Sequence, residues 1–110
     1  MIFSKGEILL VTMVFTDGSG TKKRPVLVVF DSGDDDLLVA PVTSQPIRSD
    51  RDIALNQWQQ SGLRLPSIIR LEKLATVHKS TVQRRLGRIK ADDWNNVKNV
   101  LKNFFGNILA

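Results

Sequence analysis

The clearest periodicity in this sequence lies at its C-terminal end, and it restricts what the remaining residues can form. Apolar side chains recur there at helical spacing on one stripe, which comprises Trp94, Val97, Val100, Leu101, Phe104, Phe105, Ile108 and Leu109. Asp92 and Asp93 lie in the first turn, where carboxylates interact favourably with the helix dipole. An amphipathic helix buries its apolar stripe against another element, so the preceding residues are expected to supply a sheet.

The preceding residues contain strand-like runs separated by turn residues. Residues 7–15, 25–30, 37–44 and 67–72 are rich in strand-forming types, and shorter extended pieces are expected around 52–55, 75–78 and 86–89. The run 25–30 is apolar on both faces, which predicts a central strand after a loop over 16–23. Pro41 predicts an edge position or a bulge. We therefore predict a mainly β (α+β) fold, a strongly bent antiparallel sheet or small barrel closed by one terminal helix.

Length and composition limit the class of protein. The 110 residues predict one domain over 1–110, and a hydrophobic content of 42% is enough for a core. The sequence has no cysteine, which excludes disulfides and thiolate metal sites. No run approaches the roughly 20 apolar residues that cross a bilayer, and the N-terminus does not read as a signal peptide. We expect a cytoplasmic protein that makes no membrane contact.

Positive charge is concentrated in the second half of the chain. Residues 1–55 contain 6 Lys or Arg and 8 Asp or Glu, whereas residues 56–110 contain 10 and 3, within a net charge of +5. A basic half suits a polyanion such as RNA, or an acidic protein partner. Charge alone leaves nucleic-acid binding and a solvated basic surface equally open.

Several familiar motifs are incomplete. The run GSGTKK at 18–23 lacks the spacing of a phosphate-binding loop, and DSGDDD at 31–36 lacks the order of a calcium loop. His78 is the only histidine, so neither a zinc site nor a serine-hydrolase triad is expected. We expect no metal and no cofactor.

Three segments, in order, resemble the MazF/PemK family of endoribonuclease toxins (mRNA interferases) from type II toxin–antitoxin systems. They are residues 5–29 (KGEILLV leading into TDGSGTKKRPVLVV), residues 39–45 (VAPVTSQ) and residues 66–80 (PSIIRLEKLATVHKS), followed by LGRI and the helix. The resemblance implies an SH3-like barrel of the CcdB/MazF type and a homodimer. It also implies metal-independent cleavage of single-stranded RNA and a cognate antitoxin, which we expect to present an acidic, apolar tail.

Metal-free cleavage of RNA uses the 2′-hydroxyl as nucleophile and leaves 2′,3′-cyclic phosphate and 5′-hydroxyl ends. It needs a proton acceptor, a proton donor and groups that stabilise the charged phosphorane. Arg24 matches the family's loop arginine before proline, and its planar guanidinium suits two phosphate oxygens. Thr43 matches the family's strand-end threonine. The alternatives are a surface arginine and a hydroxyl that caps a turn.

Arg70 and Glu72 are two residues apart in a predicted strand, which places them on one face. The spacing resembles the catalytic Arg-x-Asp pair of the PemK branch, with a carboxylate one methylene longer. Glu72 is then a candidate base and Arg70 a candidate phosphate clamp. The alternative is an exposed ion pair that contributes little. His78, where many relatives carry Asp, is expected to be structural and is the next candidate for proton transfer.

Further side chains are expected to contact RNA, namely Ser19, Lys22, Lys23, Ser44, Gln45 and Trp58. Trp58 could stack on an unpaired base, although tryptophan is more often a core or interface residue. Two other functions remain open: a non-enzymatic DNA gyrase poison of the CcdB type, and a catalytically inactive binding barrel. The first is disfavoured because residues 107–110 lack the tryptophan-containing tail of those poisons.

Overall fold

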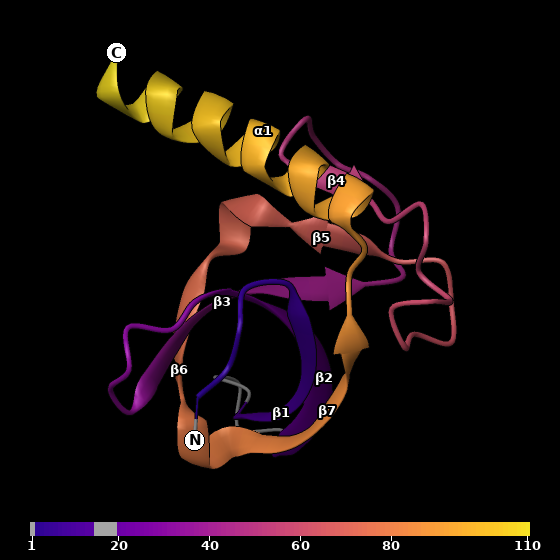
Figure 1. Ribbon diagram of the computed structural model, residues 1–110, viewed down its shortest axis with the longest axis vertical. Helices are drawn as coiled ribbons and strands as arrows, with labels where there is room; N and C mark the ends of the chain where they lie inside the picture. Colours follow the sequence, from indigo (N-terminus) through magenta and orange to yellow (C-terminus); the bar gives the residue numbers. More distant parts are fainter. Residues whose placement is uncertain (1, 15–19) are drawn as a thin grey trace.

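Strands precede a single long helix in the computed structural model, which describes residues 2–14 and 20–110 (Figure 1). The elements are β1 (Glu7–Val14), β2 (Thr21–Phe30), β3 (Asp36–Thr43), β4 (Asp52–Ala54), β5 (Ile68–Arg70), β6 (Ala75–His78), β7 (Val82–Arg88) and α1 (Ala91–Leu109). Two short 3₁₀ turns, η1 (Leu71–Lys73) and η2 (Lys79–Thr81), flank β6. No helix in the described residues is long and apolar enough to span a membrane.

The strands form one antiparallel sheet in the order β4-β5-β3-β2-β1-β7, and β6 pairs with β3 beside this path. β2 lies between β1 and β3, as its two apolar faces predicted. The sheet curls strongly and α1 crosses one end of it (Figure 1). The predicted mainly β fold with a terminal helix is therefore confirmed. The pairings among the described residues leave β4 and β7 as edges, so the sheet bends like a barrel but does not close.

β2 begins four residues earlier than the sequence predicted. The loop was expected over residues 16–23 and the strand from residue 25, but Thr21 pairs with Val14, Lys23 with Thr12 and Arg24 with Val11. The pairing with β1 overrides the weak strand propensity of the basic run. Lys22, Lys23 and Arg24 therefore project from a hydrogen-bonded strand.

Pro41 does not lie on an edge strand, so that part of the prediction was wrong. β3 pairs with β2 along one side, and along the other it pairs first with β6 over 36–39 and then with β5 over 42–43. Pro41 lies where β3 changes partner from β6 to β5. Its missing N–H is tolerated because neither strand pairs with it there.

The sheet is covered on both faces, which explains the doubly apolar run of β2. Leu27 packs with the core under α1, which also contains Ile8, Ile69 and Val97. Its neighbours in β2 point inward to a second core, which comprises Phe3, Leu9, Val11, Val26, Val28, Leu37 and Val39. Alternate residues of one strand thus supply two cores.

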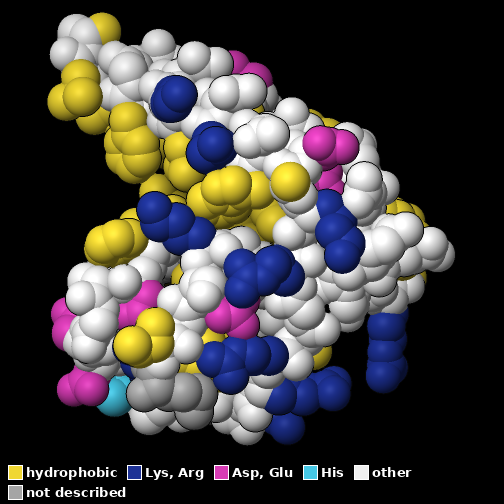
Figure 2. All heavy atoms as spheres, in the orientation of Figure 1, with side chains coloured by type: hydrophobic (Ala, Val, Ile, Leu, Met, Phe, Trp, Pro, Cys, Tyr) yellow, Lys and Arg dark blue, Asp and Glu magenta, His cyan; other side chains and the backbone are white. Residues whose placement is uncertain are grey.

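The apolar stripe of α1 packs on the sheet only in its first half. Val97 is fully buried, whereas Phe105, Ile108 and Leu109 are exposed. The free end of the helix extends past the sheet (Figure 1), and Figure 2 shows hydrophobic side chains on its underside above a notch. The sequence predicted the stripe correctly, but the sheet covers only part of it.

Asp31 fastens the N-terminal segment to the end of β2. Its carboxylate accepts the backbone N–H of Phe3 at 2.9 Å and of Gly33 at 2.8 Å, and Lys79 Nζ lies 3.1 Å away. These contacts, the Phe3 hydrogen bond first, lower the pKa of Asp31 from 3.8 to about 2. The ionised carboxylate therefore stabilises the folded chain.

We predict that Asp31→Asn flattens the acid dependence of stability. Since the folded pKa is about 2 against 3.8 for the unfolded chain, the Asp31 contribution is complete above about pH 4 and is lost as pH falls through about 2. Urea unfolding at several pH values between 4 and 2 should show a shallower decline for Asp31→Asn than for the wild type. Parallel declines would contradict this assignment.

Candidate functional site

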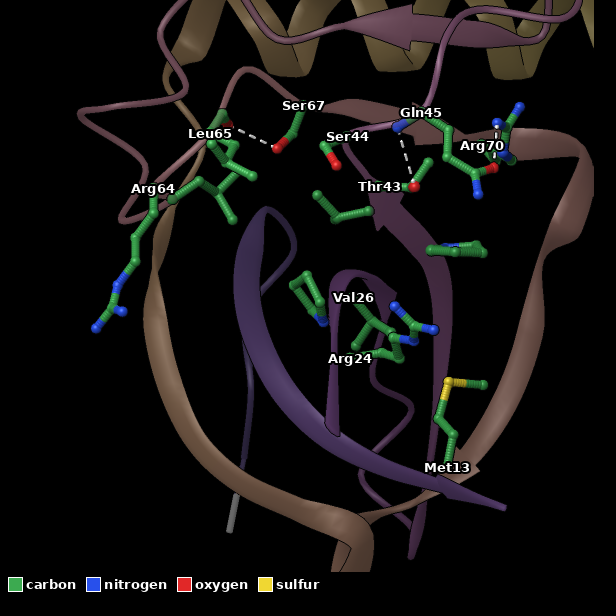
Figure 3. Close-up of a pocket in the computed structure, with 14 residues that line it drawn as sticks. Met13, Arg24, Val26, Thr43, Ser44, Gln45, Arg64, Leu65, Ser67 and Arg70 are labelled. Atoms are coloured by element: carbon green, nitrogen blue, oxygen red, sulfur yellow. Dashed lines mark hydrogen bonds between the residues drawn. The ribbon is translucent and has the colours of Figure 1, made fainter. Parts of the chain in front are cut away.

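A pocket of about 460 Å³ opens where β2, the end of β3 and the segment before β5 meet (Figure 3). We call it the main pocket. Five of the residues singled out from the sequence line it: Arg24, Thr43, Ser44, Gln45 and Arg70. Three separate parts of the chain supply these side chains, so the fold brings together residues that the sequence places up to 46 positions apart.

Arg24 extends into the main pocket from β2 (Figure 3). Its backbone is held by pairing with Val11 of β1, and its side chain is exposed. Pro25 follows it in the same pocket wall. A guanidinium carried by a paired strand is better oriented than one on a loop, because the ladder fixes its Cα–Cβ direction.

Thr43 ends β3, opposite Ile68 of β5. Its Oγ1 accepts the backbone N–H of Gln45 at 3.2 Å (Figure 3). The hydroxyl therefore caps the turn that leaves the strand, and its own O–H proton can still be donated into the pocket. The turn-capping and phosphate-binding interpretations are thus compatible in the same side chain.

Arg70 is buried and tied to two other segments of the chain. Its Nη1 lies 2.6 Å from Asp52 Oδ2, while Nη2 donates to Gln45 Oε1 and Pro46 O, each at 3.3 Å. The pair forms because Asp52 of β4 lies opposite Arg70 of β5 in the register. Arg70 thus holds β4 and the chain after β3 together. Asp52 was not singled out from the sequence, which offers no signal for it beyond a short predicted strand.

The predicted placement of Arg70 and Glu72 on one strand face was wrong. β5 ends at Arg70, and Glu72 lies in the 3₁₀ turn η1, which buries Leu71 instead. Glu72 is exposed, and its carboxylate accepts a hydrogen bond from Arg51 Nε at 2.7 Å. It does not line the main pocket but an adjoining hollow on the far side of Arg70.

The remaining predicted contacts lie elsewhere. Lys22 and Lys23 are exposed on β2 but do not line the main pocket, and Trp58 packs against the core under α1. His78 is on β6, where its Nδ1 lies 2.8 Å from Ser80 Oγ. Ser19 lies outside the described residues. No group of three or more His, Asp or Glu side chains suited to a metal ion occurs within 2–14 and 20–110.

Sequence reasoning missed one wall of the pocket, formed by Leu63, Arg64, Leu65 and Ser67. Two sets of contacts hold the segment that carries this wall in place. Fully buried Asp93 accepts the backbone N–H groups of Asn56 at 2.9 Å and Gln57 at 3.0 Å. At Gly62, which has φ +89°, a Cβ atom would lie 2.0 Å from the carbonyl oxygen of Leu86. Gly62 is therefore required for the wall to lie against β7.

A family model described as "PemK-like, MazF-like toxin of type II toxin-antitoxin system" matches residues 4–105. A comparison with curated protein sequences gives no match.

Solved structures with a similar fold have low sequence identity. A Mycobacterium tuberculosis toxin, MazF-mt6, is 20% identical with a TM-score of 0.75, covering 91% of this chain and 96% of that one. A mycobacterial endoribonuclease in complex with its cognate antitoxin is 16% identical with a TM-score of 0.78, covering 96% of each chain. A MazE-MazF structure from Deinococcus radiodurans is 16% identical with a TM-score of 0.79, covering 96% and 97%. These similarities establish the fold.

We predict unequal stability costs for the two arginine–carboxylate pairs. Arg70 and Asp52 side chains are 7% and 4% exposed, so Arg70→Ala leaves a buried carboxylate and should cost about 3–5 kcal/mol. Arg51 and Glu72 are 34% and 47% exposed, so Glu72→Gln should cost at most about 1 kcal/mol. Urea unfolding measures both costs. Equal losses of unfolding free energy in the two variants would show that burial does not determine how much each ion pair contributes to stability.

Proposed function

This chain belongs to the PemK-like, MazF-like toxins of type II toxin–antitoxin systems, and on that premise we propose that it is an endoribonuclease that cuts single-stranded RNA at preferred sequences without a metal ion. The observation that carries the proposal is the meeting of Arg24, Thr43 and Ser44 in one pocket. An arginine and two hydroxyls are donors suited to a phosphodiester. Cleavage of RNA by the purified protein separates this proposal from a gyrase poison and from a catalytically inactive binding barrel.

In the proposed reaction the 2′-oxygen attacks the adjacent phosphorus and the bond from phosphorus to the 5′-oxygen breaks. The products are a 2′,3′-cyclic phosphate and a 5′-hydroxyl, and the proton that the 2′-hydroxyl gives up to the base is balanced by the proton that the leaving 5′-oxygen gains. Arg24 donates to the non-bridging oxygens, whose charge grows in the phosphorane, and the Thr43 hydroxyl donates a further hydrogen bond. Arg70 is a positioning residue here, because it holds Gln45 and the strand end that carries Thr43.

The proton acceptor is assigned separately from these donors. No carboxylate or imidazole lines the main pocket among the residues that the structure describes. Glu72 borders the adjoining hollow and keeps its proposed role as base. Its salt bridge to Arg51 has to open for it to reach a 2′-hydroxyl, so this role is tested by its own variant, Glu72→Gln.

A cognate antitoxin is the proposed regulator. The main pocket combines Arg24 and Arg64 with an apolar wall of Val26, Leu63 and Leu65. An acidic, apolar peptide tail fits that combination and would exclude RNA from the same pocket. We expect that the RNA and the antitoxin both bind the protein in the cytoplasm. Two of the similar solved structures are described as complexes of this kind, an endoribonuclease with its antitoxin and MazE-MazF.

We predict that the wild-type protein cuts a long single-stranded RNA in EDTA and that Arg24→Ala reduces the rate about 10²–10³-fold, the usual cost of losing one preorganised donor. Lys98→Ala, on the polar side of α1, serves as the control for loss of a surface cation. Single-turnover cleavage and circular dichroism measure rate and folding. Dependence on added magnesium, or unchanged turnover in a folded Arg24→Ala protein, would count against the mechanism.

We also propose a homodimer that buries the free end of α1. Ile108 and Leu109 are 60% and 84% exposed and continue the apolar stripe whose first half is buried, which is costly for an isolated chain in water. Ile108→Glu should therefore shift the protein toward monomer, as measured by light scattering at micromolar concentration. A fully active wild-type monomer at that concentration would exclude the dimer.

A further inference from the structure

A second hollow adjoins the main pocket on the far side of Arg70. It has a volume of about 260 Å³, and we call it the side hollow. Its lining consists of Arg48, Ser49, Arg51, Asp52, Arg70, Glu72 and Lys73. Arg70 lines both cavities, so they adjoin at its side chain. Every lining residue is charged or carries a hydroxyl, which makes the side hollow unlike the main pocket with its apolar wall.

The side hollow carries uncompensated positive charge. Its two carboxylates are already engaged, Asp52 with Arg70 at 2.6 Å and Glu72 with Arg51 at 2.7 Å. The other two lining cations, Arg48 and Lys73, form no side-chain ion pair within the described part of the chain. Arg51 also pairs with Asp50 at 3.0 Å, outside the lining. Arg48 and Lys73 therefore remain as the two exposed lining cations that no carboxylate pairs with in the described residues.

The backbone that carries these cations is fixed. The N–H of Arg48 donates to Asp52 Oδ2 at 2.8 Å, and the N–H of Arg51 donates to Ser49 Oγ at 3.1 Å. The N–H of Leu71, next to Glu72 in η1, donates to the carbonyl oxygen of Arg51 at 3.0 Å. The turn before β4 and the 3₁₀ turn after β5 are thus fastened together around the cavity. A cationic hollow built on a fixed backbone binds an anion with little reorganisation.

We propose that the side hollow binds a phosphate of the RNA that flanks the nucleotide held in the main pocket. The inference rests on the proposed endoribonuclease function and adds a binding site to it. A phosphodiester suits the side hollow because its lining offers cations and the Ser49 hydroxyl but no aliphatic or aromatic residue on which a base could pack. RNA that lies over Arg70 would contact the protein at a phosphate beyond the scissile bond. A substrate that is extended on that side of the cut would therefore bind more tightly.

The test uses single-stranded oligonucleotides with a 2′-deoxy nucleotide at the cut, so that binding is measured without cleavage. One is a short core, and the others are extended by a few nucleotides on the 5′ or the 3′ side. The double variant R48A/K73A is compared with the wild type and with K98A/K102A, which removes two cations from α1. Fluorescence anisotropy at several salt concentrations gives the affinity and its salt dependence.

We expect the wild type and K98A/K102A to bind one of the extended oligonucleotides more tightly than the core. R48A/K73A should bind the extended and core oligonucleotides with the same affinity, equal to that of the wild type for the core. Its slope of log affinity against log salt on the extended oligonucleotide should fall by about 0.7 for each phosphate that the variant no longer binds.

Three outcomes overturn the proposal. If R48A/K73A keeps the length dependence and the salt slope of the wild type, the side hollow does not bind RNA even though the endoribonuclease function stands. If the wild type neither binds nor cuts RNA, the proposed function and the side-hollow site are both wrong. A drop in core binding equal to the drop on extended RNA would mean a general electrostatic effect and would also remove the site.

Discussion

The buried ion pair between Arg70 and Asp52 is the interaction on which the site depends. Both side chains are almost fully enclosed, and their contact joins the two three-residue strands β4 and β5. The second guanidinium nitrogen reaches Gln45 and Pro46, just after the strand end that carries Thr43. Arg70 therefore holds β4 and the segment after β3 in position beside the main pocket. A charge buried in this way is stable only with its partner in place.

Local pattern in the sequence predicted the helix and the central strand, and the resemblance to a family supplied residues that line the main pocket. The helix follows from apolar spacing, and the central position of β2 follows from a run that is apolar on both faces. Arg24 and Thr43 were identified by resemblance to a family, and the fold places both in the same pocket. These residues lie on long strands, whose side-chain directions are regular and therefore predictable.

The errors come from short elements and from pairings between distant residues. The strand expected to carry Glu72 ends at Arg70, because Leu71 is buried by a 3₁₀ turn that no local pattern distinguishes from one more strand residue. Asp52 went unnoticed because its importance depends on the register of β4 against β5. The wall at residues 63–65 depends on the contact of Gly62 with β7 and on Asp93, which lies 36 residues from Gln57. Such contacts are fixed by the fold as a whole.

The central claim is that the main pocket directs a 2′-hydroxyl at the neighbouring phosphate. The most direct measurement is mass analysis of the ends produced from an RNA and from the same RNA with a single 2′-deoxy nucleotide on the 5′ side of the main cut. The proposed mechanism predicts 2′,3′-cyclic phosphate and 5′-hydroxyl ends on the unmodified RNA and no cut at the deoxy position, with other sites unaffected. Cleavage that continues at the deoxy position and leaves 5′-phosphate ends would contradict it.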